Sequence, residues 1–288
     1  MAETGFTHIE IEPGRRVHAC IEGSAGAPVI LYDAGAYGIY ADGWWLKEAL
    51  KTDFRVCLYD RAGMGASDPL PPGQTPSPDW HAGEMVRLLD AIGVDGPIIL
   101  VGHSMAGLRL HAFATLFPGH LRGLVFVDAV SPRVAKAPVT YFGHRQFNWI
   151  AKATARGASM GLADMAARFA PNHFKLQGKP RADQVAALAS QRHHDTARDE
   201  VLAIDHKADY LDGGAVVQFP LAIFACTVVN GMEPADAEAA RLNSGYGWYG
   251  RFPRENHMSI LVDVYAEAIA NRIRDIHHHT RAAVTPSA

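Results

Sequence analysis

The chain has 288 residues, of which 48% are hydrophobic and 20% are charged. This composition is enough for one large core, or for one core with an inserted subdomain. The formal net charge is −3 and the basic residues are scattered, which argues against a nucleic-acid surface or an anionic membrane partner. No apolar run approaches the roughly 20 residues that cross a bilayer, and the first residues lack the pattern of a secretory signal.

Three cysteines, Cys20, Cys57 and Cys226, are widely spaced and form no C-x-x-C pair. Cys57 and Cys226 fall inside strand-like apolar runs, so we expect them to be small core residues in a reducing compartment. These features together predict a cytoplasmic protein.

The first expected elements are an antiparallel hairpin over about residues 7–22 and a series of short apolar runs separated by amphipathic helices. The runs lack alternation and are bounded by turn residues, which is typical of parallel strands covered on both faces. The expected strands after the hairpin are 29–32, 54–59, 97–101, 124–127 and 220–225.

Two helices stand out in this pattern. Ser77 and Pro78 are typical of an N-cap and a first helical residue, and an apolar stripe follows them through Ile92. A second stripe over residues 262–276 predicts a C-terminal helix. Three consecutive histidines at 277–279 are expected at a solvated helix end rather than in a metal site.

The alternation of strands and helices stops after residue 127. Residues 131–215 contain helix-like stretches, such as 182–189, and no clear strand, and the β pattern resumes at Val216. A helical block inserted after the sixth expected strand predicts a lid over the carboxyl edge of the sheet. We therefore expect a core of residues 1–130 and 216–288 with a helical cap of residues 131–215. Aromatic residues in this cap suggest either an apolar pocket or the cap's own core: Tyr141, Phe142, Phe147 and Trp149.

The most specific motif is Gly102-His103-Ser104-Met105-Ala106, which follows a strand-like run and precedes a helix-like one. A strand, Gly-x-Ser-x-small and a helix together are typical of a nucleophile elbow. The serine must adopt a strained backbone conformation, and the residues two before and two after it must be small. The sequence therefore predicts that Ser104 is a nucleophile at the N-terminus of a helix.

On this motif the chain resembles the α/β-hydrolase superfamily, in particular its small serine esterase and cofactor-free haloperoxidase-like branch. The family usually has glycine where Ala106 stands. The resemblance covers the chain outside the expected cap and implies an α/β fold with a mostly parallel sheet flanked by helices. A loop over residues 58–67 also resembles the family, and there we expect Asp60 and Arg61 to order the loop by hydrogen bonding without a catalytic role.

The resemblance also implies an oxyanion hole. After the strand at 29–32 the family usually has His-Gly-x, and Ala34 replaces that histidine here. The backbone N–H groups of Ala36 and Met105 are the implied oxyanion donors, because a backbone donor does not depend on its side chain.

The expected general base is His257, which lies just before the C-terminal helix, where the superfamily has the last member of its triad. A neutral imidazole suits this role because its ordinary pKa is near working pH. His103, beside the nucleophile, is expected to be a packing residue whose side chain points away from Ser104.

The acid that orients the base has two candidates. Most relatives place it after the strand at 220–225, but this chain has Val228 and Val229 there and reaches Glu233 only later. A minority of relatives supply it one strand earlier, where Asp128 ends the run at 124–127. We favour Asp128 and keep Glu233 as the alternative; either would fix the imidazole tautomer and stabilise its positive charge.

The predicted activity is cleavage of a small, apolar carboxylic ester through an acyl-enzyme on Ser104. The same triad also serves cofactor-free perhydrolases or haloperoxidases, lactonases and C–C bond hydrolases, while a non-catalytic ligand receptor is the alternative from another class. A serine nucleophile argues against epoxide hydrolase or dehalogenase chemistry, whose relatives use aspartate. We expect no cofactor and no metal, since the neighbouring pair His193 and His194 is expected to be exposed. The expected partner is a small-molecule ester, and a homodimer is left open.

Overall fold

The computed structural model describes residues 5–136, 152, 156–157, 167, 169–204, 208–226, 231–253 and 255–284. Within these residues eight strands form one sheet in the order β1-β2-β4-β3-β5-β6-β7-β8. Strands β1 and β2 form an antiparallel hairpin and β2 pairs antiparallel with β4, whereas all pairs from β4 to β8 are parallel. The strands are β1 (Gly5–Glu12), β2 (Arg15–Glu22), β3 (Val29–Asp33), β4 (Arg55–Tyr59), β5 (Ile98–His103), β6 (Leu121–Val127), β7 (Leu221–Ala225) and β8 (Gly247–Arg251). The expected mostly parallel α/β sheet is confirmed.

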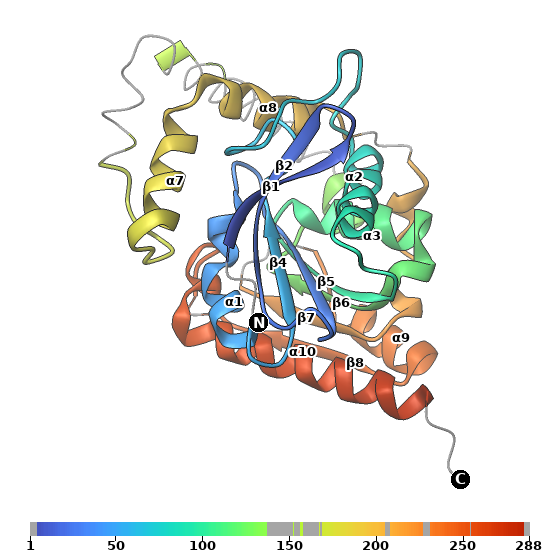
Figure 1. The fold of residues 1–288 in the computed structure, drawn as a ribbon. Coiled ribbons are helices and arrows are strands. Elements are labelled where there is room, and N and C mark those ends of the chain that lie inside the picture. The colour runs from blue at the N-terminus through green and yellow to red at the C-terminus, as the bar shows by residue number, and fades with distance from the viewer. Residues whose placement is uncertain are drawn as a thin grey trace.

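Helices cover both faces of this sheet, as Figure 1 shows. One face packs on α1 (Trp44–Leu50) and α10 (Asp263–Val284), and the other on α2 (Pro78–Ala91), α3 (Ala106–Leu116) and α9 (Pro234–Ser244). Successive side chains of a strand enter opposite cores: Ile30 packs with the first group and Leu31 with the second. Burial on both sides explains why the apolar runs do not alternate.

The ends of two elements follow from local chemistry. Ser77 accepts a hydrogen bond from the Trp80 N–H at 3.2 Å, and Pro78 is the first residue of α2, as the sequence predicts. The β pattern does not resume at Val216, because Val216–Gln218 is a 3₁₀ turn and β7 begins at Leu221. Strand β8 was not predicted; its two glycines and half-buried side chains give it a weak strand signal.

Between β6 and β7 the described residues contain helices and no strand. They are α4 (Pro132–Lys136), α7 (Gly178–Ala189), α8 (Gln191–Leu202) and the 3₁₀ turns Asp209–Asp212 and Val216–Gln218. In Figure 1, α7 and α8 lie apart from the helices that flank the sheet. The division into a core and a cap of residues 131–215 stays a prediction. The aromatic residues Tyr141, Phe142, Phe147 and Trp149 lie outside the described residues.

One expectation about histidines is wrong, and a second holds only for His278, which is exposed. His193 and His194 are buried rather than exposed, because α8 packs them against Tyr37. At the C-terminal helix, His277 is buried with its ring nearly perpendicular to that of Phe54, and His279 donates to the carbonyl of Ser244 at 2.8 Å. Helix periodicity alone did not show that these faces are covered by residues distant in sequence.

The three cysteines are buried free thiols, as the expected core positions require. Burial raises the pKa of the Cys57 thiol to about 12, which keeps it protonated. Among the described residues, no helix is both long and apolar enough to cross a membrane.

His111 on α3 provides a test of how burial affects acid stability. Neither of its ring nitrogens has a hydrogen-bond partner among the described residues, and burial lowers its pKa to about 3. Below pH of roughly 6.5 the unfolded chain binds a proton at this residue that the folded chain cannot accept. Stability is therefore lost at up to about 1.4 kcal/mol per pH unit as pH falls from there towards 3.

We expect His111→Leu to reduce this loss. Stability should be equal to or above that of the wild type at pH 7.5, and it should fall less steeply between pH 6.5 and 4.5. Urea unfolding at several pH values measures both quantities. If the stability of the two proteins fell equally steeply with pH, buried His111 would not be the cause of the loss.

Candidate active site

Ser104 lies at the tight turn between β5 and α3. Its backbone φ is +56°, a conformation that costs energy for any residue with a side chain. Its N–H donates to the carbonyl of Val127 at 3.2 Å, and its own carbonyl accepts from the Val130 N–H at 2.8 Å. These bonds hold the turn against the end of β6.

The small residues around Ser104 are required by this turn. A Cβ atom on Gly102 would lie 2.6 Å from a methyl group of Leu110 and 3.1 Å from the Cβ of Ala106. The positions two before and two after the serine therefore face each other with no room for larger side chains. This is the packing that the elbow motif predicts.

Three side chains from distant parts of the chain form one line of hydrogen bonds. His257 Nε2 lies 2.7 Å from Ser104 Oγ, and His257 Nδ1 lies 2.6 Å from Asp128 Oδ2. Ser104 follows β5, Asp128 follows β6, and His257 lies in the loop before α10. The structure thus brings together the three residues that the sequence singled out as nucleophile, base and acid.

Asp128 is held rigidly beside this histidine. Its carboxylate is buried, and its second oxygen accepts the Cys226 N–H at 2.8 Å. Its N–H donates to the carbonyl of Phe224 at 2.6 Å, and its φ is +42°. Both strand ends, β6 and β7, therefore fix the direction in which the carboxylate points.

The alternative acid, Glu233, lies elsewhere. It caps the N-terminus of α9 in a reciprocal arrangement with Asp236, whose carboxylate accepts the Glu233 N–H at 2.7 Å. It also forms an ion pair with Arg133 and is half exposed. Val228 and Val229, where the sequence lacked a carboxylate, are outside the described residues.

His103 does not contact Ser104 by a hydrogen bond. Its Nε2 lies 2.8 Å from the carbonyl oxygen of His257, so this nitrogen carries a hydrogen and donates it. Burial, followed by the neighbouring His257, lowers the pKa of His103 to about 3, which keeps its ring neutral. The side chain thus anchors the loop that carries His257, a contact that goes beyond the expected packing role.

The loop after β3, residues 34–37, lies directly against Ser104 and is called the β3 loop below. A Cβ atom added to Gly35 would lie 2.8 Å from the Cβ of Ser104 and 3.3 Å from its hydroxyl oxygen. Among the described residues, neither Ala36 N–H nor Met105 N–H donates to a protein acceptor. Two backbone N–H groups without a described protein acceptor therefore lie next to Ser104 in sequence and in the loop packed against it.

We expect Gly35→Ala to lower esterase kcat by at least tenfold, because its methyl group must displace Ser104 or the β3 loop. The matched control is Gly26→Ala, at a glycine whose added Cβ meets nothing within 4 Å. Turnover and thermal melting of both variants measure the effect. Wild-type kcat in the Gly35 variant would show that the loop and the serine can move apart without consequence.

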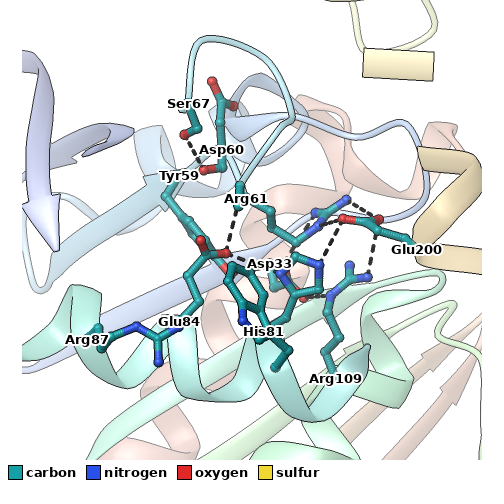
Figure 2. A network of polar contacts seen from close by, with 12 residues as sticks. Asp33, Tyr59, Asp60, Arg61, Ser67, His81, Glu84, Arg87, Arg109 and Glu200 are labelled. Carbon is teal, nitrogen blue, oxygen red and sulfur yellow. Dashed lines mark hydrogen bonds and ion pairs between the residues drawn. The ribbon is translucent and has the colours of Figure 1, made fainter. Parts of the chain in front are cut away.

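A cluster of buried charges underlies the β3 loop, and Figure 2 shows it. Asp33 is the last residue of β3, Arg61 lies in the loop after β4, Arg109 is in α3 and Glu200 is in α8. All four are at most 2% exposed.

Asp60 orders its own loop as expected, accepting from the Ala66 N–H at 3.1 Å. The reach of Arg61 into this cluster was not predicted, because it depends on which loops the fold places side by side.

Within the described residues, no group of three or more His, Cys, Asp or Glu side chains is arranged to hold a metal ion. The described site presents a hydroxyl, an imidazole, a carboxylate and backbone N–H groups without a protein acceptor.

Comparison with known proteins defines the family. Residues 28–200 match the sequence pattern of the family described as alpha/beta hydrolase fold, which is more than half of the chain. The chain therefore belongs to the α/β-hydrolase fold family, and the resemblance inferred from the elbow is confirmed.

Individual curated relatives align with only about a third of this chain. The chain is 38% identical over 106 residues to a protein of Cronobacter sakazakii titled "Putative carbamate hydrolase RutD", an alignment that covers 36% of this chain and 38% of that protein. Across three curated relatives, the chain spans only 16% to 38% of their length.

Solved structures share this fold over nearly all of the chain's length. One titled as a putative epoxide hydrolase from Pseudomonas aeruginosa has a TM-score of 0.75 at 16% identity, covering 98% of this chain and 99% of that one. A thermophilic esterase from Thermogutta terrifontis has a TM-score of 0.65 at 20% identity, covering 95% and 100% of the two chains. At such identities the likeness shows the fold alone.

Proposed function

We propose that this protein is a serine hydrolase that cleaves small, apolar carboxylic esters through an acyl-enzyme on Ser104. The observation that carries the proposal is the hydrogen-bonded line from Asp128 through His257 to Ser104, with distances of 2.6 and 2.7 Å. A nucleophile joined to a base that is itself oriented by a third group is the arrangement that acyl transfer requires.

In the proposed reaction, His257 Nε2 takes the proton of Ser104 as its oxygen attacks the ester carbonyl carbon. The negative charge that develops on the carbonyl oxygen is stabilised by the Ala36 and Met105 N–H groups. The protonated His257 then gives its proton to the leaving alcohol. Water repeats the sequence on the acyl-enzyme with the same histidine as base, which releases the acid and restores Ser104.

Asp128 supports this cycle without taking the proton. Its carboxylate accepts the Nδ1 hydrogen of His257, which leaves Nε2 free to act as a base towards Ser104. It also stabilises the imidazolium that forms in each half of the reaction. Because the carboxylate is buried and points at the ring, solvent screens this attraction little.

Ser104 also argues against epoxide opening, although a structural neighbour is named for it. A serine that opened an epoxide would form an ether, which water does not cleave under enzymatic conditions. A carboxylate nucleophile would instead form an ester that water can hydrolyse. The residue at the elbow therefore favours acyl substrates.

A carbamate is the second candidate substrate class. The aligned relative is titled as a carbamate hydrolase, at 38% identity over 106 residues. Carbamate cleavage needs the same nucleophile, base and oxyanion donors, and it differs in the leaving group to which His257 gives its proton.

The test is turnover of 4-nitrophenyl esters of increasing acyl length beside a matched 4-nitrophenyl carbamate. We expect ester hydrolysis with the highest kcat/KM for short acyl chains, and no turnover by Ser104→Ala. Faster turnover of the carbamate than of each ester would favour the second candidate. If the folded wild-type protein turned over neither class, the proposal would be wrong.

A cytoplasmic location belongs to the same proposal. It is supported by three buried thiols that form no disulfide. Fractionation of cells that produce the protein would test it.

A further inference from the structure

Arg61 reaches from the loop after β4 to the carbonyl groups of the β3 loop. Its Nη2 donates to the carbonyl oxygen of Gly35 at 3.0 Å, and its Nη1 donates to that of Ala34 at 2.8 Å. Arg109 donates a second hydrogen bond to the Ala34 carbonyl from α3. Two guanidinium groups therefore hold two successive peptide units of this loop.

The Gly35 contact bears directly on the Ala36 N–H. The carbonyl of Gly35 and the N–H of Ala36 belong to one planar trans peptide, in which they point in opposite directions. Fixing the oxygen on one side therefore fixes the direction of the N–H on the other side. Withdrawal of electrons from the oxygen by a cation also polarises the peptide, which strengthens the N–H as a donor.

The cluster around Arg61 keeps its guanidinium in one place. Glu200 on α8 accepts from Nε at 2.8 Å and from Nη2 at 3.1 Å, a two-point contact that fixes the plane of the group. Burial alone would lower the pKa of Arg61, but Glu200 and then Asp33 more than offset it, and the pKa is raised. The Arg61 guanidinium is therefore always charged, shielded from solvent and fixed in orientation (Figure 2).

We propose that Arg61 is a positioning residue for the oxyanion hole. By binding the Gly35 carbonyl it orients the Ala36 N–H, and Glu200 from α8 holds the Arg61 guanidinium in place. This inference rests on the proposed function, since it assigns a task to the oxyanion donor of that reaction.

A second contact from α8 has the same target. His193 Nδ1 accepts the Gly65 N–H at 3.2 Å, so its Nε2 carries the hydrogen and donates to the carbonyl of Tyr37 at 3.1 Å. Burial is the main cause that lowers the pKa of His193 to about 4, and the ring stays neutral in this bridge. Tyr37 itself has a φ of +57°. Helix α8 therefore braces both ends of the β3 loop, through Arg61 and through His193.

The test uses Arg61→Lys and a charge-balanced pair, Arg61→Met with Glu200→Gln. Lysine keeps the charge but lacks the planar fork. The pair removes one positive and one negative charge together. Asp33 and Arg109 each lose one partner but still pair with each other at 2.5 Å, so no buried charge is left alone and the variant can fold even if lysine is not accommodated. The matched control is Lys47→Met with Glu22→Gln, a largely buried ion pair at 2.8 Å between α1 and β2 that bonds neither the β3 loop nor the four clustered charges.

The readout is the tetrahedral adduct of Ser104 with a trifluoromethyl ketone carrying ¹³C at its carbonyl. Titration of the ¹³C shift gives the pKa of the hemiketal oxygen, which reports on the oxyanion donors directly. We expect this pKa to be raised by about one unit or more in both Arg61 variants. Ester kcat should fall by about 10- to 100-fold with KM changed less than threefold, since removing a donor costs the transition state more than the bound ester. The control pair should lower the melting temperature but leave the hemiketal pKa and kcat unchanged.

An unchanged hemiketal pKa in folded Arg61 variants would overturn the inference while leaving the hydrolase proposal intact. An equal shift of the hemiketal pKa in the control pair would also overturn it, because the effect would then come from the loss of any buried ion pair. If the wild-type protein formed no adduct at Ser104, the proposed function would fail first, and the inference with it.

Discussion

Replacing Ser104 with alanine is expected to abolish ester hydrolysis and to leave the fold intact. The hydroxyl oxygen is the atom at the end of the hydrogen-bonded line, and the alanine methyl group fits wherever the serine Cβ already lies. Loss of a triad member costs on the order of 10⁴- to 10⁶-fold in kcat in the proteases where it has been measured. The measurement is kcat for a short nitrophenyl ester, together with thermal melting.

The control for this substitution is Ser131→Ala. Ser131 is a buried serine near the same edge of the sheet, where its hydroxyl helps to cap α4, and it does not contact His257. We expect this variant to keep wild-type kcat.

The partnership of Ser104 with His257 gives a second outcome from the same series. His257→Ala should be nearly as damaging as Ser104→Ala, and the double variant should be little worse than either one. If the two free-energy costs simply added, the two residues would act independently, which contradicts their contact at 2.7 Å.

The second large effect is expected for Asp128→Asn, with kcat lowered by about 10⁴-fold. The asparagine oxygen can keep the hydrogen bond from the Cys226 N–H, so its NH₂ group then faces His257 Nδ1. That nitrogen must accept, which moves the ring hydrogen to Nε2 and removes the lone pair that Ser104 needs. Stopped-assay kinetics on the folded variant measure the loss.

Glu233→Gln is the matched control for this substitution. It removes the charge of the other candidate acid, which caps α9 and pairs with Arg133 at the surface. We expect wild-type kcat and a small loss of stability, because exposed ion pairs contribute little. An inactive Glu233→Gln enzyme beside an active Asp128→Asn enzyme would move the acid to the later loop.

The sequence predicted those parts of the site that depend on local pattern. The elbow around Ser104 follows from a strand, two small residues and a helix, all within a short segment. Asp128 was favoured because some relatives carry the acid after this strand and because Val228 and Val229 stand where most others have it. The structure gives the physical reason, since β6 pairs parallel with β5 and both strands end at the same edge of the sheet.

The residues that were missed depend on tertiary contacts. Arg61 was expected only to order its own loop, yet its guanidinium crosses to the carbonyl of Gly35. Glu200 lies 139 residues further along the chain, and nothing near it in sequence indicates that it pairs with Arg61. His193 was expected at the surface. Its burial results from the contact of α8 with the β3 loop, which lies far away in sequence.

The account's central claim is that Ser104 is a nucleophile activated by His257, and covalent labelling tests it most directly. A fluorophosphonate should react so that the Ser104 oxygen bonds to phosphorus and fluoride leaves, and peptide mapping should then locate the adduct. We expect one adduct, on Ser104, formed at least 10²-fold more slowly in His257→Ala, as the loss of a general base requires. Label on another residue, or an unlabelled Ser104 in a protein that still hydrolyses esters, would contradict the claim.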